Sequence, residues 1–259
     1  MTSVTSLPEY LRERLRVERL DRAGLRARFS FPPDLQGPPA TGHGGGVTAM
    51  LLEMVRAYLE AEGDPGVLDG PLTLEVRLHR PLPLEALAIG EVRPGAGGWH
   101  SRVVLEGRAV AEADVRPAAG PPEAPGITRA AWDGESRKGS LVPAYDWCLG
   151  CGVKNPRGAQ LRLSFDESWV WEEVAPPRHF ASAGRLSAGY LAIVCDELGW
   201  WLGALRQGEC GVSNRLTVTL GPARPPEPLL LVGSRDSVVG GDARGRIWQT
   251  TALVLDAGR

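Results

Sequence analysis

The sequence has no apolar run near the roughly 20 residues that a membrane-spanning helix needs. The opening segment MTSVTSLPEYLRERLRVERL also lacks the apolar core of a signal peptide. An excess of charge of one sign is missing too, because the net charge is -2 and the pI is near 6.1. No basic surface favours a nucleic acid or an anionic membrane as a partner, and we expect a cytoplasmic protein.

Cysteine is scarce and confined to the second half of the chain, at Cys148, Cys151, Cys195 and Cys210. The spacing matches no disulfide framework and is typical of reduced thiols. One CxxC pair without two further spaced ligands is weak evidence for zinc, so we interpret it as a turn with buried thiols and expect no metal. The nucleotide motifs GK[ST] and GxGxxG are also missing.

What the chain does contain is an internal repeat, interrupted by a segment rich in proline, glycine and alanine. The stretch 118–140 has no periodicity and is predicted to be a linker between a first domain, 1–117, and a second, 141–259. In both domains an alternating strand pattern leads through a PP pair into a long apolar run. Those runs are VTAMLLEMVRAYLEAE and YLAIVCDELGWWLGAL, which follow the strand patterns at 25–31 and 169–174.

Each apolar run has the length and spacing of a helix, and its few polar residues predict burial nearly all round. Strand patterns broken by glycine and proline follow each run. Each repeat is therefore predicted to be α+β, with two strands, a long buried helix and a further set of antiparallel strands. Pairing the two copies would cover the surfaces that each leaves exposed, so we expect a pseudo-dimer.

Both predicted helices contain an acid near the middle. From the second proline of each PP pair to the first acid is 20 residues in one copy (Pro33 to Glu53) and 19 in the other (Pro177 to Asp196). We attribute the difference to one extra residue before the glycines, so the two acids are predicted to occupy matching positions. Acids are rarely buried without a reason, which favours a function over a structural ion pair.

The two copies resemble the hotdog-fold acyl-CoA thioesterases, in particular the phenylacetyl-CoA thioesterase-like branch, whose central helix opens with a pattern like HGGVLATLLDE. The second copy has SAGYLAIVCDE from Ser187 to Glu197, and the first has GGGVTAMLLE from Gly44 to Glu53. Two departures stand out, Ser187 and Ala188 where the family has His-Gly, and Gly44 where it has His.

Two further segments support the resemblance. LQGPP is similar to the HQG-type loop before the helix, with Gln36 in the polar position, and CLGCGVKNPRGAQLRLSF (148–165) is similar to the opening of many such domains. The resemblance implies a double hotdog, in which two repeats, each with a long central helix wrapped by an antiparallel sheet, pack as a pseudo-dimer.

Thioester hydrolysis needs donors for the negative charge on the carbonyl oxygen and a carboxylate to activate water or attack directly. A helix N-terminus supplies free N–H groups, and glycine lets the thioester carbonyl approach them. An acid two to three turns along the same helix lies about 13 Å from that N-terminus. The resemblance therefore implies that the acid comes from the antiparallel helix of the other copy.

Two composite sites follow from this arrangement. The site that we favour pairs Asp196, as base or nucleophile, with Gly45, Gly46 and Gln36, because it has both the glycine turn and an acid that aligns without a gap. His43, beside these glycines, either binds substrate or occupies an exposed turn.

The other composite site pairs Glu53, the second candidate catalytic acid, with the N–H of Ala188, near His179 and Ser187. Loss of a single oxyanion donor costs about 2.7–4 kcal/mol in barrier height, so one active and one decayed site is our expectation. Glu197 is interpreted as a structural or interface residue.

The predicted function is that of an acyl-CoA thioesterase-like hydrolase acting on a hydrophobic or aromatic acyl thioester. No metal or redox cofactor is expected, and coenzyme A enters only as part of the small-molecule substrate.

Two alternative functions stay open. One is an acyl-thioester hydratase or dehydratase, which the HF pair at His179 suggests, and the other is a non-catalytic acyl-CoA-binding hotdog protein. A homodimer of two pseudo-dimers is also left open. Four tryptophans either line an acyl pocket or pack in the core (Trp169, Trp171, Trp200 and Trp201).

Overall fold

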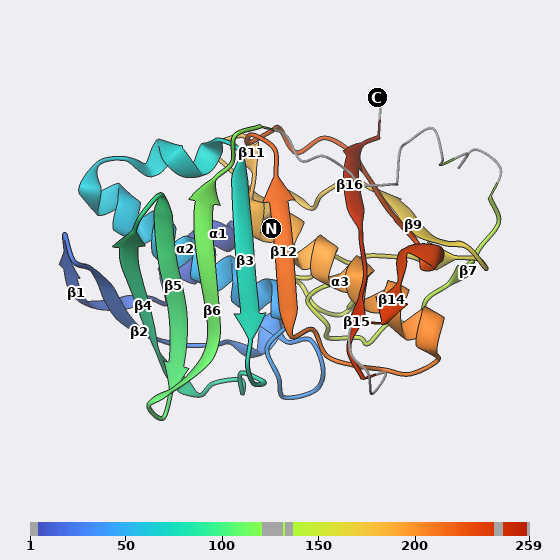
Figure 1. Cartoon of the computed structure of the whole chain (residues 1–259), viewed down its shortest axis with the longest axis horizontal. Coiled ribbons are helices and arrows are strands. Elements are labelled where there is room, and N and C mark those ends of the chain that lie inside the picture. Colours follow the sequence, from blue (N-terminus) through green and yellow to red (C-terminus); the bar gives the residue numbers. More distant parts are fainter. Residues whose placement is uncertain (1–4, 121–131, 133–136, 241–245, 258–259) are drawn as a thin grey trace.

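The computed structural model describes residues 5–120, 132, 137–240 and 246–257, and shows two central helices behind an antiparallel layer of strands (Figure 1). The first half contains α1 (Leu7–Arg12), β1 (Arg16–Asp21), β2 (Gly24–Ser30), α2 (Gly44–Glu62), β3 (Leu72–Leu78), β4 (Leu87–Gly95), β5 (Gly98–Leu105) and β6 (Arg108–Pro117). The second half contains β7 (Ser140–Leu141), β8 (Ser164–Phe165), β9 (Trp169–Val174), β10 (Ala181–Ser182), β11 (Arg185–Leu186), α3 (Ala188–Gln207), β12 (Arg215–Leu220), β13 (Leu229–Ser234), β14 (Val239–Gly240), β15 (Trp248–Gln249) and β16 (Leu253–Asp256).

The ends of the two long helices are set by capping residues. The N-cap side chains of His43 and Ser187 each accept a hydrogen bond from the N–H two residues further on. Gly63 and Gly208 end α2 and α3 in the left-handed conformation, with φ of 84° and 71°. Both predicted helices are thus confirmed.

The strands form two main antiparallel sheets, ordered β1-β2-β4-β5-β6-β3-β12 and β16-β13-β9-β8-β7. β12 comes from the second half but pairs with β3 of the first, with Val218 opposite Leu74, so the larger sheet spans both halves. Within the described residues no strand takes the place in the second half that β6 takes in the first, and β16 does not pair with β12 (Figure 1). The α+β architecture predicted from the repeat is therefore confirmed, with unequal sheets.

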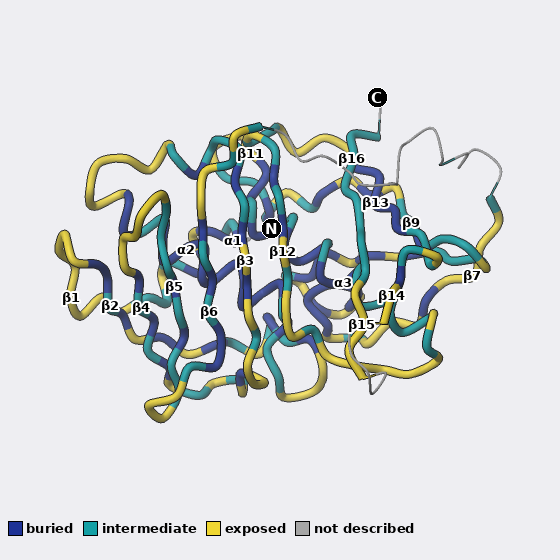
Figure 2. Tube along the Cα trace, in the orientation of Figure 1, coloured by how far each residue is buried: buried dark blue, intermediate teal, exposed yellow. Residues whose placement is uncertain are grey.

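The core lies between the helices and the inner face of the sheets. Figure 2 shows that α2 is buried except near its end and that α3 is mostly buried in its first half, whereas the edge strand β1 is exposed along its whole length. Buried residues of α2 include Met50, Leu51 and Met54, and those of α3 include Val194 and Leu198. In the part of the chain that the structure describes, no helix has the length and apolar character of a membrane span.

The two central helices run antiparallel and touch where each has a glycine. A Cβ added to Gly45 would lie 2.5 Å from Cα of Ile193, and one added to Gly189 would lie 2.8 Å from Cβ of Ala49. These two contacts are equivalent under a pseudo-two-fold that relates the halves. The antiparallel pairing that the resemblance implied is present.

The same pseudo-two-fold corrects the predicted alignment of the acids. The second proline of each PP pair lies ten residues before its N-cap, His43 or Ser187, so the first copy has no extra residue. Glu53 and Glu197 both lie ten residues after their N-caps, and Asp196 corresponds to Leu52. The predicted match of Glu53 with Asp196 is wrong by one residue, because two consecutive acids in α3 made the register ambiguous.

We predict that Gly45→Ala lowers the free energy of unfolding by about 1–3 kcal/mol, because its methyl group would enter the backbone of α3. This loss outweighs the gain of up to about 1 kcal/mol that alanine brings to a helix. Urea unfolding followed by circular dichroism measures it. Gly66→Ala is the control, since its Cβ would have no heavy atom within 4 Å. Equal stability of Gly45→Ala and the parent would contradict the close helix contact.

Candidate active site

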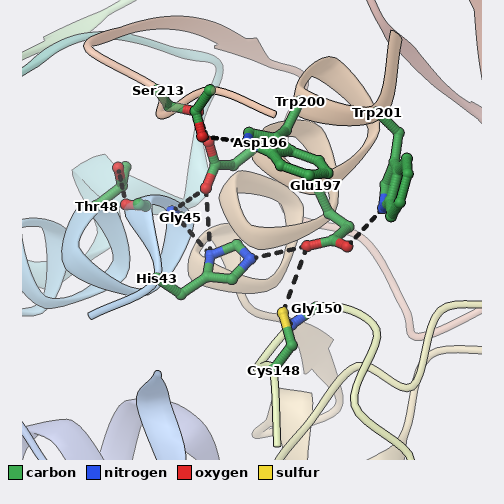
Figure 3. A network of polar contacts seen from close by, with 12 residues as sticks. His43, Gly45, Thr48, Cys148, Gly150, Asp196, Glu197, Trp200, Trp201 and Ser213 are labelled. Carbon is green, nitrogen blue, oxygen red and sulfur yellow. Dashed lines mark hydrogen bonds and ion pairs between the residues drawn. The ribbon is translucent and has the colours of Figure 1, made fainter. Parts of the chain in front are cut away.

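Asp196, in the middle of α3, lies against the start of α2 (Figure 3). Its carboxylate accepts a hydrogen bond from the N–H of Gly45 at 2.7 Å and another from the hydroxyl of Ser213 at 2.6 Å. Nδ1 of His43 lies 3.2 Å from the same carboxylate. Asp196 is buried, so these contacts replace the water that would otherwise solvate its charge.

The N–H groups of Gly44 and Gly46 are free at this helix N-terminus. Within the described residues neither donates to another group, whereas the N–H of Gly45 is already bonded to Asp196. A Cβ on Gly44 would lie 2.7 Å from Oδ2 of Asp196, so carboxylate and free N–H are neighbours. Gly46 faces Leu149 instead, because its Cβ would lie 2.8 Å from Cδ2 of that residue. Gly44 is therefore the free glycine donor nearest to Asp196, and the predicted oxyanion role of Gly45 and Gly46 stays a prediction.

His43 is held between two carboxylates and is not exposed to substrate. Its Nε2 lies 3.1 Å from Oε2 of Glu197, and its side chain is buried. Burial alone would lower the pKa of His43, but the hydrogen bond to Glu197 and the charges of Asp196 and Glu197 raise it above its ordinary value. Burial alone would raise the pKa of Glu197, but His43 holds it below its ordinary value. The interpretation of His43 as part of an exposed turn is wrong, whereas a contact with substrate stays a prediction.

Gln36 contributes its backbone to the site. Its carbonyl oxygen accepts a hydrogen bond from the N–H of Leu149 at 2.7 Å, and it forms a β-bridge with Gly42. Among the described residues its side-chain amide forms no hydrogen bond with protein. Gln36 thereby fixes the loop that contains Leu149 next to His43.

Among the described residues, Glu53 forms no hydrogen bond with the N-terminus of α3. Its carboxylate lies 3.7 Å from Nε of Arg12 and 3.6 Å from Nε of Arg56, and its buried Oε2 has no hydrogen-bond partner among the described residues. Burial raises the pKa of Glu53 to about 7, against the opposing charges of Arg56 and Arg12. The predicted pair of Glu53 with the N–H of Ala188 is absent, because Leu52 takes the place that Asp196 has in the other half.

The other residues predicted for this second site are only partly together. Ser187 accepts a hydrogen bond from the N–H of Gly189 at 3.1 Å, and within the described residues the N–H of Ala188 is free. His179 instead bonds through Nε2 to the carbonyl oxygen of Arg157 at 3.1 Å. Burial lowers the pKa of His179 below its ordinary value. No contact of its imidazole points to a role beside Glu53.

A cavity of about 350 Å³ opens beside Ser187 and Ala188, lined also by Arg12, Arg56 and Leu191. Asp196 lies at the opposite helix N-terminus, where the segment 208–214 covers it through the hydroxyl of Ser213. The carboxylate of Asp196 and this cavity thus lie at different ends of the helix pair.

Sequence reasoning missed Ser213, which lies 17 residues after Asp196 in an irregular segment with no recognisable motif.

The four tryptophans form two groups. Trp200 and Trp201 contact each other at 4.8 Å between ring centroids, whereas Trp169 and Trp171 both contact Trp132. They do not form one pocket.

Comparison with protein-family models and with curated proteins finds no match. Two solved structures are similar over almost the whole chain. A protein of Thermobifida fusca YX assigned as a thioesterase II is 16% identical, with a TM-score of 0.58, covering 96% of this chain and 99% of that one. The tesB protein of Mycobacterium avium subsp. paratuberculosis is 15% identical, with a TM-score of 0.56, covering 96% of this chain and 93% of that one. At this identity the likeness shows the fold, and the predicted double hotdog is confirmed.

We predict that Glu53 makes folding less favourable as the pH rises. Its pKa is about 7 in the folded protein against an ordinary value of 4.5, so between these values the folded state binds more protons than the unfolded chain. Relative to Glu53→Gln, the parent should lose on the order of 3 kcal/mol of unfolding free energy between about pH 4.5 and about pH 8.

Urea unfolding of both proteins across this pH range measures the difference. Exposed Glu62 on the same helix supplies the control Glu62→Gln, for which the difference from the parent should stay constant with pH. A constant difference for Glu53→Gln as well would show that Glu53 is ionised normally in the folded protein.

Proposed function

We propose that the protein hydrolyses an acyl thioester of a hydrophobic or aromatic acid at the N-terminus of α2. The observation that carries the proposal is the position of Asp196, whose carboxylate from one helix lies beside the free N–H of Gly44 at the start of the other. A base or nucleophile next to a preorganised donor is the minimum that acyl transfer requires. The thioesterase names of the two similar structures agree with this chemistry.

In the proposed reaction the thioester carbonyl oxygen accepts a hydrogen bond from the N–H of Gly44. The positive end of the α2 dipole stabilises the negative charge that develops on that oxygen. Asp196 takes a proton from water as the water oxygen bonds to the carbonyl carbon. The carbon–sulfur bond then breaks, and the proton passes to the leaving thiolate. The products are a free carboxylic acid and a thiol such as coenzyme A.

Direct attack by Asp196 on the carbonyl carbon is the alternative first step, giving an anhydride that water then hydrolyses. In both routes Gly45 and Ser213 hold the carboxylate in place. Substrate reaches Asp196 in this proposal by displacing the exposed residues 208–212, while Ser213 keeps its hydrogen bond to the carboxylate.

The pseudo-symmetric position is proposed to be inactive in hydrolysis. It retains a helix N-terminus with a free N–H at Ala188, but the apolar side chain of Leu52 replaces the carboxylate. The cytoplasmic location, the specific acyl group and the possible homodimer stay predictions.

We predict that Asp196→Asn lowers kcat/KM for the best substrate by at least roughly 100-fold, because the amide is neither a base nor a nucleophile. Glu53→Gln should stay within about threefold of the parent, since Glu53 lies away from the free N–H of Gly44. The measurement is free-thiol release from short, medium, long-chain and aryl acyl-CoA substrates.

Loss of turnover in Glu53→Gln alone would place the active site at the other end of the helix pair. Binding of acyl-CoA without turnover in the parent would favour the non-catalytic alternative. Hydration of a crotonyl thioester without thiol release would favour the hydratase.

We predict that Ser213→Ala lowers kcat by about tenfold with little change in KM, because the hydroxyl orients the carboxylate and does not bind the acyl group. Ser213→Thr, which keeps a hydroxyl at this position, should restore most of the rate. Steady-state kinetics of both variants on the best substrate test this. An increase in KM at unchanged kcat would instead place Ser213 among the substrate-binding residues.

A further inference from the structure

A second buried cluster lies behind Asp196 and contains three donor types that bind metal ions. Nε2 of His43, Sγ of Cys148 and Oε2 of Glu197 all lie within 4.8 Å of one another, and all three residues are buried (Figure 3). Oε2 of Glu197 is 3.1 Å from Nε2 of His43 and 3.6 Å from Sγ of Cys148. The three side chains come from the start of α2, from a loop of the second half, and from α3.

Cys151 is the candidate fourth donor and lies next to this cluster. It follows Cys148 by three residues in one tight turn, and its thiol is close enough to influence the charges of Cys148, Glu197 and His43. Only 4% of Cys151 is exposed. The cluster thus combines the two sulfurs of a CxxC pair with one imidazole and one carboxylate.

The loop from Cys148 to Gly152 is shaped around this cluster. The N–H of Gly150 donates to Sγ of Cys148 at 3.3 Å, and the N–H of Gly152 donates to the carbonyl oxygen of Cys148 at 3.0 Å. A Cβ on Gly150 would lie 2.3 Å from Oε2 of Glu197, and one on Gly152 would lie 2.3 Å from the Cys148 carbonyl oxygen. The turn therefore directs the sulfur of Cys148 toward Glu197.

Two of the donor separations are close to those of a tetrahedral zinc site. With Zn–N and Zn–O bonds of about 2.0 Å and a Zn–S bond of about 2.3 Å, tetrahedral angles put the nitrogen and oxygen about 3.3 Å apart and the sulfur and oxygen about 3.5 Å apart. The observed separations are 3.1 Å and 3.6 Å. Two sulfurs with nitrogen and oxygen donors in this geometry favour Zn²⁺ among the divalent ions.

Outer partners already orient the donors as zinc sites require. Nδ1 of His43 faces Oδ2 of Asp196 at 3.2 Å, which leaves Nε2 directed at the cluster. The indole N–H of Trp201 donates to Oε1 of Glu197 at 3.0 Å, which leaves Oε2 toward the sulfur of Cys148. A carboxylate on the far side of a ligating imidazole is a recurrent feature of zinc sites.

We propose that Cys148, Cys151, His43 and Glu197 bind one Zn²⁺ as a structural site between the two halves of the chain. Coordination displaces the thiol protons of Cys148 and Cys151 and leaves Nε2 of His43 unprotonated. Four protein ligands close the coordination sphere, so the ion binds no water or substrate. It ties α2 to α3 and to the Cys148 loop, and it fixes the imidazole that contacts Asp196.

This site does not rest on the proposed hydrolysis, and either can fail without the other. The sequence expectation of no metal considered only the CxxC pair. The third and fourth ligands are far from this pair in the sequence, and only folding brings them beside it.

 Counted from the ends of the CxxC pair, His43 precedes Cys148 by 105 residues and Glu197 follows Cys151 by 46.

The first experiment measures metal content in the whole protein purified without chelator, by inductively coupled plasma mass spectrometry. The expected result is one zinc per chain. Cys151→Ser should lose at least roughly nine tenths of the bound zinc, because three protein ligands hold a structural ion far less tightly than four. Exposed Cys210 supplies the matched control Cys210→Ser, which should keep its zinc.

The second experiment does not depend on the folding of a variant. Cobalt is exchanged into the unaltered protein, and the expected absorption spectrum combines a thiolate-to-cobalt charge-transfer band with intense tetrahedral ligand-field bands. Absence of zinc in the purified protein, together with no such spectrum after addition of Co²⁺, would overturn the proposal. Zinc retained at full stoichiometry in Cys151→Ser would overturn the assignment of this ligand set.

Discussion

The close antiparallel contact between α2 and α3 is the constraint on which the rest of the structure depends. Gly45 and Gly189 allow it, because any side chain at Gly45 would enter the backbone at Ile193. The contact covers the apolar helices that each half leaves exposed, and it brings the middle of one helix to the N-terminus of the other. An acid that is about 13 Å from its own helix start therefore lies beside that of its partner.

The pseudo-two-fold arrangement makes two equivalent positions, but the side chains there differ. At the start of α2, Asp196 meets the free N–H of Gly44. At the start of α3, Leu52 takes the equivalent place, and Glu53 turns toward Arg12 and Arg56. A fused chain can change one position without the other, which a symmetric homodimer cannot do. The buried aspartate is thus present at one end of the helix pair, while the cavity lies at the other.

The buried charges form one connected group at the start of α2. His43 lies between Asp196 and Glu197, and Glu197 in turn contacts Cys148 and Trp201. Charges at this depth are stable only when they are paired and hydrogen bonded. The same contacts that satisfy them hold Asp196 in a fixed orientation and gather the donors of the proposed zinc site.

The sequence by itself determined the α+β class, the two long helices and the order of elements in each repeat. These features depend on hydrophobic periodicity and on capping residues such as Ser187 and Gly208, which act over a few neighbouring positions. The resemblance added the antiparallel helix pair, and with it the pairing of Asp196 with the start of the other helix. Only the tertiary structure decided which acid matches which, because the register of the repeat depends on where each N-cap forms. The tertiary structure also brought the hydroxyl of Ser213 to Asp196, and Cys148 and Cys151 close to His43. Contacts between residues so far apart in the chain arise from packing and leave no local sequence pattern.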